Sequence, residues 1–581
     1  MSNSLFRTKS VDKIVAEGSD DSHGGGGLKR VLTTKDLTFF GIAAILGAGS
    51  FSSLGGAVYN GGPGVVILFV ITAIACAFTA FCYSDFASRI PVAGSAYTYA
   101  YASFGELFAW IIGWALIMEY SIGNIYVAYS WSDYFTSFLN KISDVTGAHW
   151  LQIPAYLSSS YMEVKHAIEA GTSNQEMLNA WNQAPVIAGI RCIVDIPALI
   201  INLLITGLVY IGIKESRNFS NVMVLLKLAV VLLIIGVGGY LVIHGDMTHN
   251  WLPLNPEGVH SFMPKGFGGV MMAVSGVFFA YIGFDAVSVL AEESKDPQRD
   301  LPKGMIYSLV ICTVIYILLT LVLTGAVSYE KFENIGDPLS FIFEPQNLNV
   351  GWMQFVVSGI AVIAMTSVLL VFQMGQPRIW MSMSRDGLMP PVFQKIHPRF
   401  KTPSFSTIIT GLVVGVPILF TDKTFVLDFT SIATLFAFVL VCGGVLLLPR
   451  KEKTQGRFHL PYFSAAIFFP LIIGLLVISI LLGWIPMISI HQYFHHLGNL
   501  DGDTASVTYN VSTIIFWVVT FIIIALSIRK KWSTIPVMGL LTCLYLLTGM
   551  TLMNWEWFGS WLLIGLVVYF LYGYKKSKLA D

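Results

Sequence analysis

The sequence predicts an all-α integral membrane protein with about 14 transmembrane helices, and two observations support this fold class. Hydrophobic residues make up 55% of the 581-residue chain and charged residues only 12%, whereas soluble proteins are about 25% charged. Apolar runs of about 20 residues recur almost to the end of the chain, and each can cross a hydrocarbon core of about 30 Å. The expected spans are 37–60, 64–88, 104–135, 186–212, 219–243, 267–291, 303–328, 351–382, 404–421, 426–448, 463–486, 512–529, 533–553 and 557–574.

The distribution of Lys and Arg orients these spans. With the N-terminus inside, most of the 34 basic residues fall in inner loops or in the two tails, as the positive-inside rule requires. We therefore expect a multi-pass protein of the plasma (cell inner) membrane with both termini in the cytoplasm. The exceptions are Lys141, Lys165, Arg191, Lys227, Lys265, Lys331 and Lys423.

Composition and residue spacing exclude several other classes of protein. Lys plus Arg and Asp plus Glu both number 34, and no basic patch interleaved with aromatic residues indicates a nucleic-acid partner. The six cysteines lie in apolar runs without metal-ligand spacing, so they are interpreted as buried thiols. No catalytic set, cofactor or metal site is expected. His491, His495 and His496 are better explained as interfacial residues than as metal ligands.

The first span contains a cluster of small residues, Gly47 to Phe51, followed by Gly55 and Gly56. Each glycine inside a helix costs about 1 kcal/mol relative to alanine. One interpretation is an unwound segment whose free amide groups and half-helix N-terminus bind a carboxylate. The other is a small-residue face for close helix packing, and spacing alone does not separate the two.

The sixth span has a matching feature, an aromatic run from Phe278 to Phe284 that is broken by Gly283 and followed by Asp285. Interrupted first helices in two halves of a chain indicate a midplane substrate site between inverted five-helix repeats. Amides and carbonyls freed at two such breaks suit an α-carboxylate and an α-ammonium. The sequence thus predicts a secondary transporter for an amino acid.

These features divide the chain into four segments. We expect a disordered cytoplasmic tail at 1–27, a first repeat at 28–243 with a long outer loop at 136–185, an inverted second repeat at 244–448, and four further C-terminal helices within 449–581. The stretch Tyr161 to Ala180 in the long loop is compatible with a surface helix over the external mouth.

Ionisable residues within apolar spans are functional candidates because charge is costly in a bilayer. Lys227 either snorkels to the inner interface or places its ammonium beside the broken first span, ready to release a proton. Glu119 is either a proton carrier or a tie between helices. Asp285 either takes part in coupling or pairs with an inner-loop base. Arg191 and Asp195 are four residues apart, a spacing that favours a local ion pair.

Three blocks of the sequence are similar to one known family. They are Arg89 to Tyr101, Phe278 to Pro302 and Gln376 to Pro403, and the pattern around Trp561 to Lys578 agrees with them. They resemble the cationic amino acid transporter branch of the amino acid-polyamine-organocation (APC) superfamily. This resemblance implies a LeuT-type 5+5 inverted repeat with broken helices 1 and 6, alternating access and no sodium dependence.

The resemblance also implies roles for individual residues. Lys227 matches a lysine that occupies the sodium position in proton-coupled relatives, and Phe279 matches the gating aromatic. The expected proton-coupling residues are Lys227, Glu119 and Asp285. The expected substrate-binding residues are Ile45, Gly47, Ala48, Gly49, Ser50, Phe279, Ala280 and Ile282.

The sequence departs from the family pattern at Ser50, Ser52 and Ser53, where apolar residues are usual, so the family name does not fix a cationic cargo. The expected function is a sodium-independent, proton-coupled amino acid permease whose partners are the amino acid, protons and the lipid bilayer. The alternatives are an obligatory amino acid exchanger and a membrane amino acid sensor that carries no flux.

Overall fold

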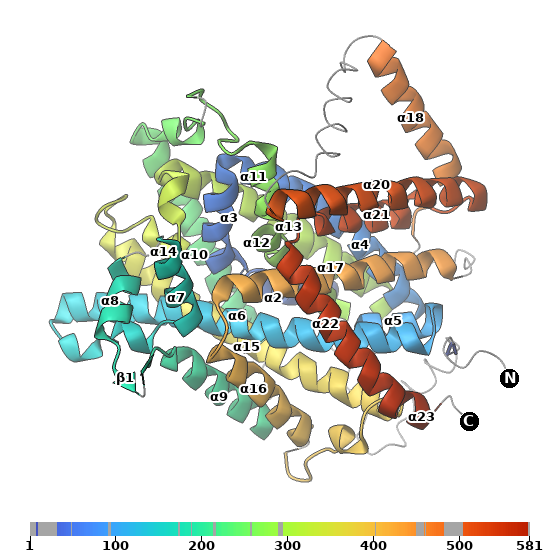
Figure 1. Ribbon diagram of the computed structural model, residues 1–581, viewed down its shortest axis with the longest axis horizontal. Coiled ribbons are helices and arrows are strands. Elements are labelled where there is room, and N and C mark those ends of the chain that lie inside the picture. The colour runs from blue at the N-terminus through green and yellow to red at the C-terminus, as the bar shows by residue number, and fades with distance from the viewer. Residues whose placement is uncertain are drawn as a thin grey trace.

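The protein is almost entirely helical (Figure 1). The computed structural model describes residues 7–9, 32–47, 49–90, 95–171, 175–187, 189–212, 217–255, 258–288, 294–400, 402–448, 458, 460–481 and 504–578. Most of the tail predicted at 1–27, residue Ala48 and the three loop histidines therefore lie outside the described residues. Two-residue strands β1 (Val186–Ile187) and β2 (Ile190–Arg191) pair in an antiparallel hairpin.

Eight helical stretches in this part of the chain are long and apolar enough to cross a membrane, and four shorter apolar helices accompany them. The total of 14 spans stays a prediction. The long helices are α4 (Val65–Arg89), α6 (Glu106–Thr146), α10 (Arg217–His244), α13 (Pro297–Ala326), α15 (Gly351–Arg385), α17 (Lys423–Leu447), α20 (Thr504–Lys530) and α22 (Leu552–Val568). The shorter ones are α9 (Ile196–Ile211), α16 (Ser404–Ile418), α18 (Ala465–Leu481) and α21 (Thr534–Leu547).

Helix α6 lies in the middle of the bundle and packs against α15 and α17 (Figure 1). Of its most apolar stretch, 89% is buried inside the protein, against 17% for α20. A helix that is apolar all round and buried belongs to the core, whereas an apolar helix with most of its surface exposed faces lipid. We therefore expect the functional site to lie along α6 and the elements that pack around it.

Both helices that were expected to be broken are interrupted. The first consists of α2 (Thr34–Ile45), a π-helical turn η3 (Gly49–Ser53) and α3 (Leu54–Gly61), with η4 (Gly62–Gly64) leading into α4. The second consists of α11 (Gly266–Met272) and α12 (Val274–Phe279), after which the chain turns before α13. The first interruption falls at the predicted glycine cluster, and the second falls within the predicted aromatic run, where α12 ends at Phe279, four residues before Gly283.

One end of the bundle, here named the cap end, carries α7 (Tyr161–Ala170) and α8 (Gln175–Gln183) where α6 finishes (Figure 1). The predicted surface helix is thus two helices. The smaller elements of the cap-end loops are η5 (His149–Leu151), η6 (Ala155–Leu157), η9 (Tyr329–Phe332) and α14 (Pro338–Phe341), and η7 (Thr248–Trp251) lies between α10 and α11.

The fourth predicted span began too early, at residue 186. The hairpin occupies that position, and α9 begins at Ile196 because Asp195 accepts the backbone N–H of Ala198 at 3.0 Å and Pro197 occupies the first turn. The predicted ion pair between Arg191 and Asp195 is wrong as well. Arg191 donates to the carbonyl of Trp181, and Asp195 accepts the hydroxyl of Ser132.

The opposite end, here named the terminal end, gathers both ends of the described chain around the start of α6. It includes α5 (Ser95–Ser103), η10 (Pro391–Gln394), η11 (Tyr569–Gly573) and α23 (Tyr574–Lys576). Residues 7–9 belong to the segment predicted to be a disordered tail, but they contact this end of the bundle: the Arg7 guanidinium lies 5.7 Å from the centroid of the Tyr574 ring.

Candidate functional site

The first break is closed locally by the carbonyl of Gly47. This oxygen accepts the N–H groups of Ser50 and Phe51, each at 3.1 Å, and the Ser50 hydroxyl at 2.9 Å. The helix that resumes at Gly49 is buried throughout its first turn. The N–H groups of Ser50 and Phe51 in this turn therefore already have an acceptor, and an anion bound here would have to replace the Gly47 carbonyl.

The second break follows Phe279, where Ile282 donates its N–H to the carbonyl of Phe279 at 3.2 Å. Gly283 then adopts φ +116°, a conformation that favours glycine. A Cβ atom at this position would lie 2.9 Å from the carbonyl carbon of Ala44. Glycine is needed here both for its backbone angle and because the first broken helix lies against it.

The two breaks contact each other directly. A Cβ atom on Gly49 would lie only 2.5 Å from the Cα atom of Ala280, so no larger residue fits at this crossing without displacing the backbone. On its other side, Gly47 packs against the side chain of Val368 in α15. The small residues thus both interrupt the helix and allow close packing, and carboxylate binding at the interruption stays a prediction.

Tyr316 of α13 joins the two breaks and was missed by the sequence analysis. Its hydroxyl lies 2.9 Å from the carbonyl oxygen of Ile45 and 2.7 Å from that of Ala280. Two carbonyl oxygens, one from each break, therefore converge on a single donor, and the Ile45 carbonyl also accepts the N–H of Gly47 at 2.9 Å. A tyrosine within an apolar span carries no sequence signal that distinguishes this role from ordinary packing.

Lys227 of α10 reaches the first broken helix rather than the membrane interface. Its side chain is only 1% exposed, and Nζ donates to the carbonyl of Ala43 at 3.2 Å. Ala43 lies in the last turn of α2, where unpaired carbonyls and the helix dipole favour a positive charge. The geometry agrees with the ammonium placement inferred from the sequence and disagrees with snorkelling.

The two buried acids form a separate group. The Asp285 carboxylate lies beside the backbone of Gly283 and Ala286 at the turn after the second break, and among the described residues no ion pair joins it to an inner-loop base. Glu119 in α6 contacts the hydroxyl of Thr434 in α17, and it interacts electrostatically with Asp285. Both side chains are 3% exposed, so neither reaches bulk water.

Among the predicted substrate-binding residues of the second break, Phe279 contacts α6. The ring of Phe279 meets that of Tyr126 edge-on, with 4.7 Å between centroids. Ile282, the residue before Gly283, is also buried. Among the described residues, the structure thus brings together Ile45, Gly47, Gly49, Ser50, Phe279 and Ala280.

Within the described ranges, no group of three or more His, Cys, Asp or Glu side chains could hold a metal ion. Five of the six cysteines are buried and Cys192 is partly exposed. The site is built from backbone carbonyls, helix ends, one lysine and aromatic rings. Such a site is suited to reversible binding of a small zwitterion.

The profile of the amino acid permease family matches residues 32–497, and that of its C-terminal region matches residues 534–577. The chain belongs to the amino acid permease family. Its relatives are permeases and transporters rather than enzymes, and they include cationic amino acid transporters of the APC superfamily. The resemblance inferred from the sequence is confirmed.

Three relatives illustrate the range of the permease family. The chain is 36% identical to the branched-chain amino acid permease BcaP of Bacillus subtilis over 580 residues, which cover 100% of both chains. It is 38% identical to a methylthioribose transporter of the same organism over 79% of this chain and 89% of that one. It is 30% identical to the vacuolar cationic amino acid transporter 2 of Arabidopsis thaliana over 100% of this chain and 94% of the relative.

Proposed function

We propose that this permease carries an α-amino acid across the membrane by alternating access, without sodium and coupled to protons. Family membership supports amino acid transport as the general activity. The observation that carries the finer proposal is the convergence of both helix breaks, with the carbonyls of Ile45 and Ala280 within reach of one hydroxyl. In the proposed architecture, two inverted five-helix repeats of the LeuT type meet at this point.

The substrate binds mainly to backbone atoms in this proposal. Its carboxylate replaces the Gly47 carbonyl as acceptor of the N–H groups of Ser50 and Phe51, because a helix N-terminus favours an anion. Its ammonium donates to the carbonyl oxygens of Ile45 and Ala280. The Tyr316 hydroxyl, which lies within reach of both oxygens, reorients to make room for it. Backbone groups recognise what all amino acids share and leave the choice of side chain to neighbouring residues.

The cargo we favour is an amino acid with an apolar side chain. Val368 packs against Gly47 at the first break, and Phe279 at the second break contacts Tyr126. Apolar walls suit a branched aliphatic side chain better than a cationic one. The full-length relative named as a branched-chain amino acid permease supports the same choice.

Lys227 supplies the proton coupling in this proposal. Its ammonium stabilises the end of α2 by donating to Ala43, and an amine can release its proton during the cycle whereas a guanidinium cannot. Glu119 and Asp285 are the second candidates because both are buried and interact with each other. We place the terminal end in the cytoplasm and the cap end outside the cell, in the plasma membrane.

The test is uptake of labelled amino acids and methylthioribose into proteoliposomes, with and without an inward proton gradient, in sodium-free buffer. We expect gradient-driven accumulation of branched-chain amino acids. Uptake only into preloaded vesicles would identify an exchanger, and binding without flux would identify a sensor. Uptake of methylthioribose alone, or of no compound in the panel, would contradict the amino acid assignment.

Substitution of Lys227 separates proton coupling from transport. Lys227→Met and Lys227→Arg are both expected to abolish gradient-driven accumulation, since neither side chain can exchange a proton near neutral pH. Lys331→Met is the matched control because Lys331 is an exposed lysine at the cap end. Accumulation by Lys227→Arg at the unsubstituted rate would remove Lys227 from the coupling mechanism.

A further inference from the structure

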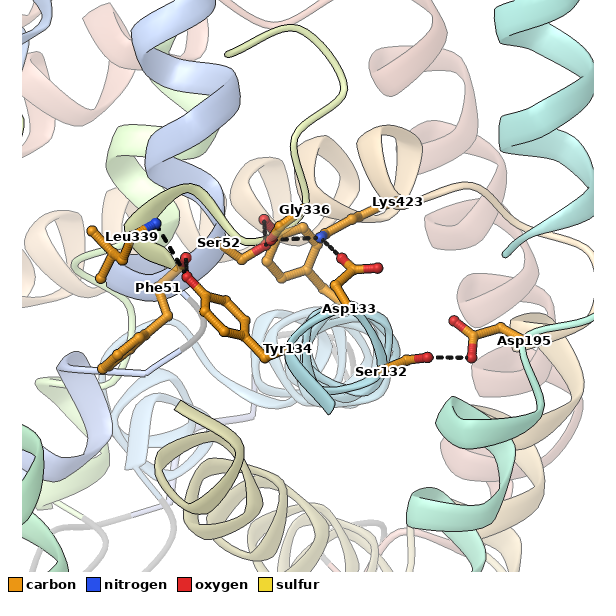
Figure 2. A network of polar contacts seen from close by, with 10 residues as sticks. Phe51, Ser52, Ser132, Asp133, Tyr134, Asp195, Gly336, Leu339 and Lys423 are labelled. Atoms are coloured by element: carbon orange, nitrogen blue, oxygen red, sulfur yellow. Dashed lines mark hydrogen bonds and ion pairs between the residues drawn. The ribbon is translucent and has the colours of Figure 1, made fainter. Parts of the chain in front are cut away.

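A polar network joins four segments of the chain at the cap end (Figure 2). Lys423, the first residue of α17, forms an ion pair with Asp133 of α6, and its ammonium lies 3.4 Å from the carbonyl oxygen of Gly336. The loop that carries Gly336 packs so closely that a Cβ atom there would meet the Asp133 carboxylate. One lysine thus connects two helices and a loop that are far apart in sequence.

The same loop is fastened to the first break. The hydroxyl of Ser52 in η3 donates to the Gly336 carbonyl at 3.0 Å. The Tyr134 hydroxyl donates to the carbonyl of Phe51 at 2.5 Å and accepts the N–H of Leu339 at 3.3 Å (Figure 2). The loop, α6 and η3 therefore hold one another in place directly beside the candidate substrate site.

Tyr126 lies between this network and the substrate site. Its hydroxyl donates to the Ser52 hydroxyl at 3.4 Å, and its ring centroid is 5.7 Å from the Lys423 ammonium. The other side of the ring packs against Phe279. A shift of Phe279 on substrate binding would be transmitted through this ring to Ser52 and Lys423, because the side chains are in contact.

We propose that Asp133, Lys423 and the Gly336 carbonyl form a gate across the substrate path at the cap end, and that Tyr126 ties closure of this gate to occupancy of the substrate site. The inference rests on the proposed transport function; Asp133, Lys423 and Gly336 lie outside the proposed binding site, and Tyr126 belongs to its wall. Asp133 and Lys423 keep side-chain exposures of 29% and 13%. An ion pair that water still reaches can break at small cost, as a gate requires.

The geometry offers a direct test by cross-linking. A Cβ atom at Gly336 would lie 3.1 Å from Cβ of Asp133, within a few tenths of an ångström of the separation of about 3.5–4.5 Å found in disulfides. Asp133→Cys with Gly336→Cys is introduced in a Cys192→Ser background, since Cys192 is the partly exposed native thiol. Mass spectrometry of the intact protein reports whether the bond forms.

Oxidation of the double variant is expected to lower uptake at least tenfold, and a reductant is expected to restore it, whereas each single cysteine variant is insensitive to oxidant. Cross-linked protein that transports as fast as the reduced form would overturn the gate. Absence of a cross-link under oxidation would overturn the proximity on which the gate depends. If the unsubstituted protein transports no compound of the uptake panel, the proposed function is wrong, and the gate proposal is wrong with it.

The rate of cross-linking tests the role of Tyr126. Bound substrate is expected to accelerate disulfide formation at least threefold, because occupancy favours the closed gate. Tyr126→Phe keeps the ring against Phe279 but loses the hydroxyl contact with Ser52, so the acceleration should disappear while thermal stability is retained. An unchanged substrate effect in Tyr126→Phe would show that Tyr126 does not link site and gate.

Discussion

The cap end and the terminal end of α6 are closed by different chemistry. At the cap end, Lys423 and Asp133 form an ion pair that remains partly exposed. At the terminal end, Glu106 is fully buried, with 0% exposure, and accepts hydroxyl groups of Tyr101 at 3.1 Å and Tyr569 at 2.9 Å as well as that of Ser577.

The terminal end is also held by the chain ends themselves. The N–H of Glu106, at the start of α6, donates to the carbonyl of Arg7 at 3.0 Å. Asp386, just after α15, accepts the Lys9 ammonium at 3.1 Å and the Tyr97 hydroxyl at 2.7 Å, and its carbonyl accepts the N–H of Lys578 at 3.1 Å. Several segments must separate before this end can open.

This difference indicates which end of the bundle opens at the lower cost in free energy. A buried acid that satisfies several hydroxyls leaves unpaired polar groups when it is disturbed, and each costs about 1–3 kcal/mol. Separating a partly hydrated ion pair costs about 1 kcal/mol or less, because water replaces the lost partner of each charge. We therefore expect the cap end to open readily and the terminal end to need a larger driving force, such as substrate binding or proton release.

The largest effect should come from Glu106→Leu. Three buried hydroxyls would lose their acceptor, so the free energy of unfolding is expected to fall by about 3 kcal/mol or more. Thermal unfolding in detergent measures the change, and Glu330→Leu at an exposed cap-end position is the control. A loss below about 1 kcal/mol would mean that the hydroxyls find water, and that the terminal end is no harder to open than the cap end.

Next in size is the interaction between Lys423 and Asp133. A double-mutant cycle with Lys423→Met and Asp133→Asn should give a coupling energy of about 1 kcal/mol, near the upper limit for an accessible pair. Thermal unfolding of the four proteins provides the cycle. A coupling energy above about 3 kcal/mol would place the pair among buried ion pairs and contradict its use as an easily opened gate.

Lys9→Met tests the ion pair at the terminal end. Asp386 retains the hydrogen bond from Tyr97 when Lys9 is replaced, so the expected loss of stability is below about 1 kcal/mol. The measurement is the same thermal unfolding, with Lys331→Met as control. A loss as large as that of Glu106→Leu would show that the N-terminal segment, rather than the buried acid, holds this end together.

The smallest effect concerns pH at the cap end. Burial in α7, followed by repulsion from Asp133, raises the pKa of Glu163 to about 8, with Lys423 acting in the opposite direction. A carboxyl group with a raised pKa favours the folded state while it is neutral, so its contribution declines as pH rises from about 5 towards 8. Glu163→Gln should therefore unfold like the unsubstituted protein at pH 5 and at a higher temperature at pH 9.

The control for this pH series is Glu169→Gln, because the Glu169 side chain lies on the same helix and is 62% exposed. Its melting temperature should follow that of the unsubstituted protein at every pH. Equal pH profiles for Glu163→Gln and the unsubstituted protein would show that Glu163 is hydrated, and that the cap end responds to pH through other groups.

Both helix breaks could be predicted from sequence because their cause is local. Gly47, Gly49 and Gly283 mark positions where the backbone needs an unusual angle or a close neighbour. The sequence left two positions open for the Lys227 ammonium, and the structure places it beside α2 rather than at the membrane interface. The early start given to α9 failed because apolar residues at 186–193 suit a short hairpin as well as a helix.

The sequence by itself determined the helical membrane class and the two interruptions, because composition, periodicity and glycine position act over a few residues. Its resemblance to known transporters indicated the family. Only the tertiary structure decided which side chains meet. Tyr316 bridges both breaks, Lys423 selects Asp133 across 290 positions, and Ser577 reaches Glu106 across 471. Such pairings depend on how helices pack and cross, and no pattern within a single helix records which distant residue it will face.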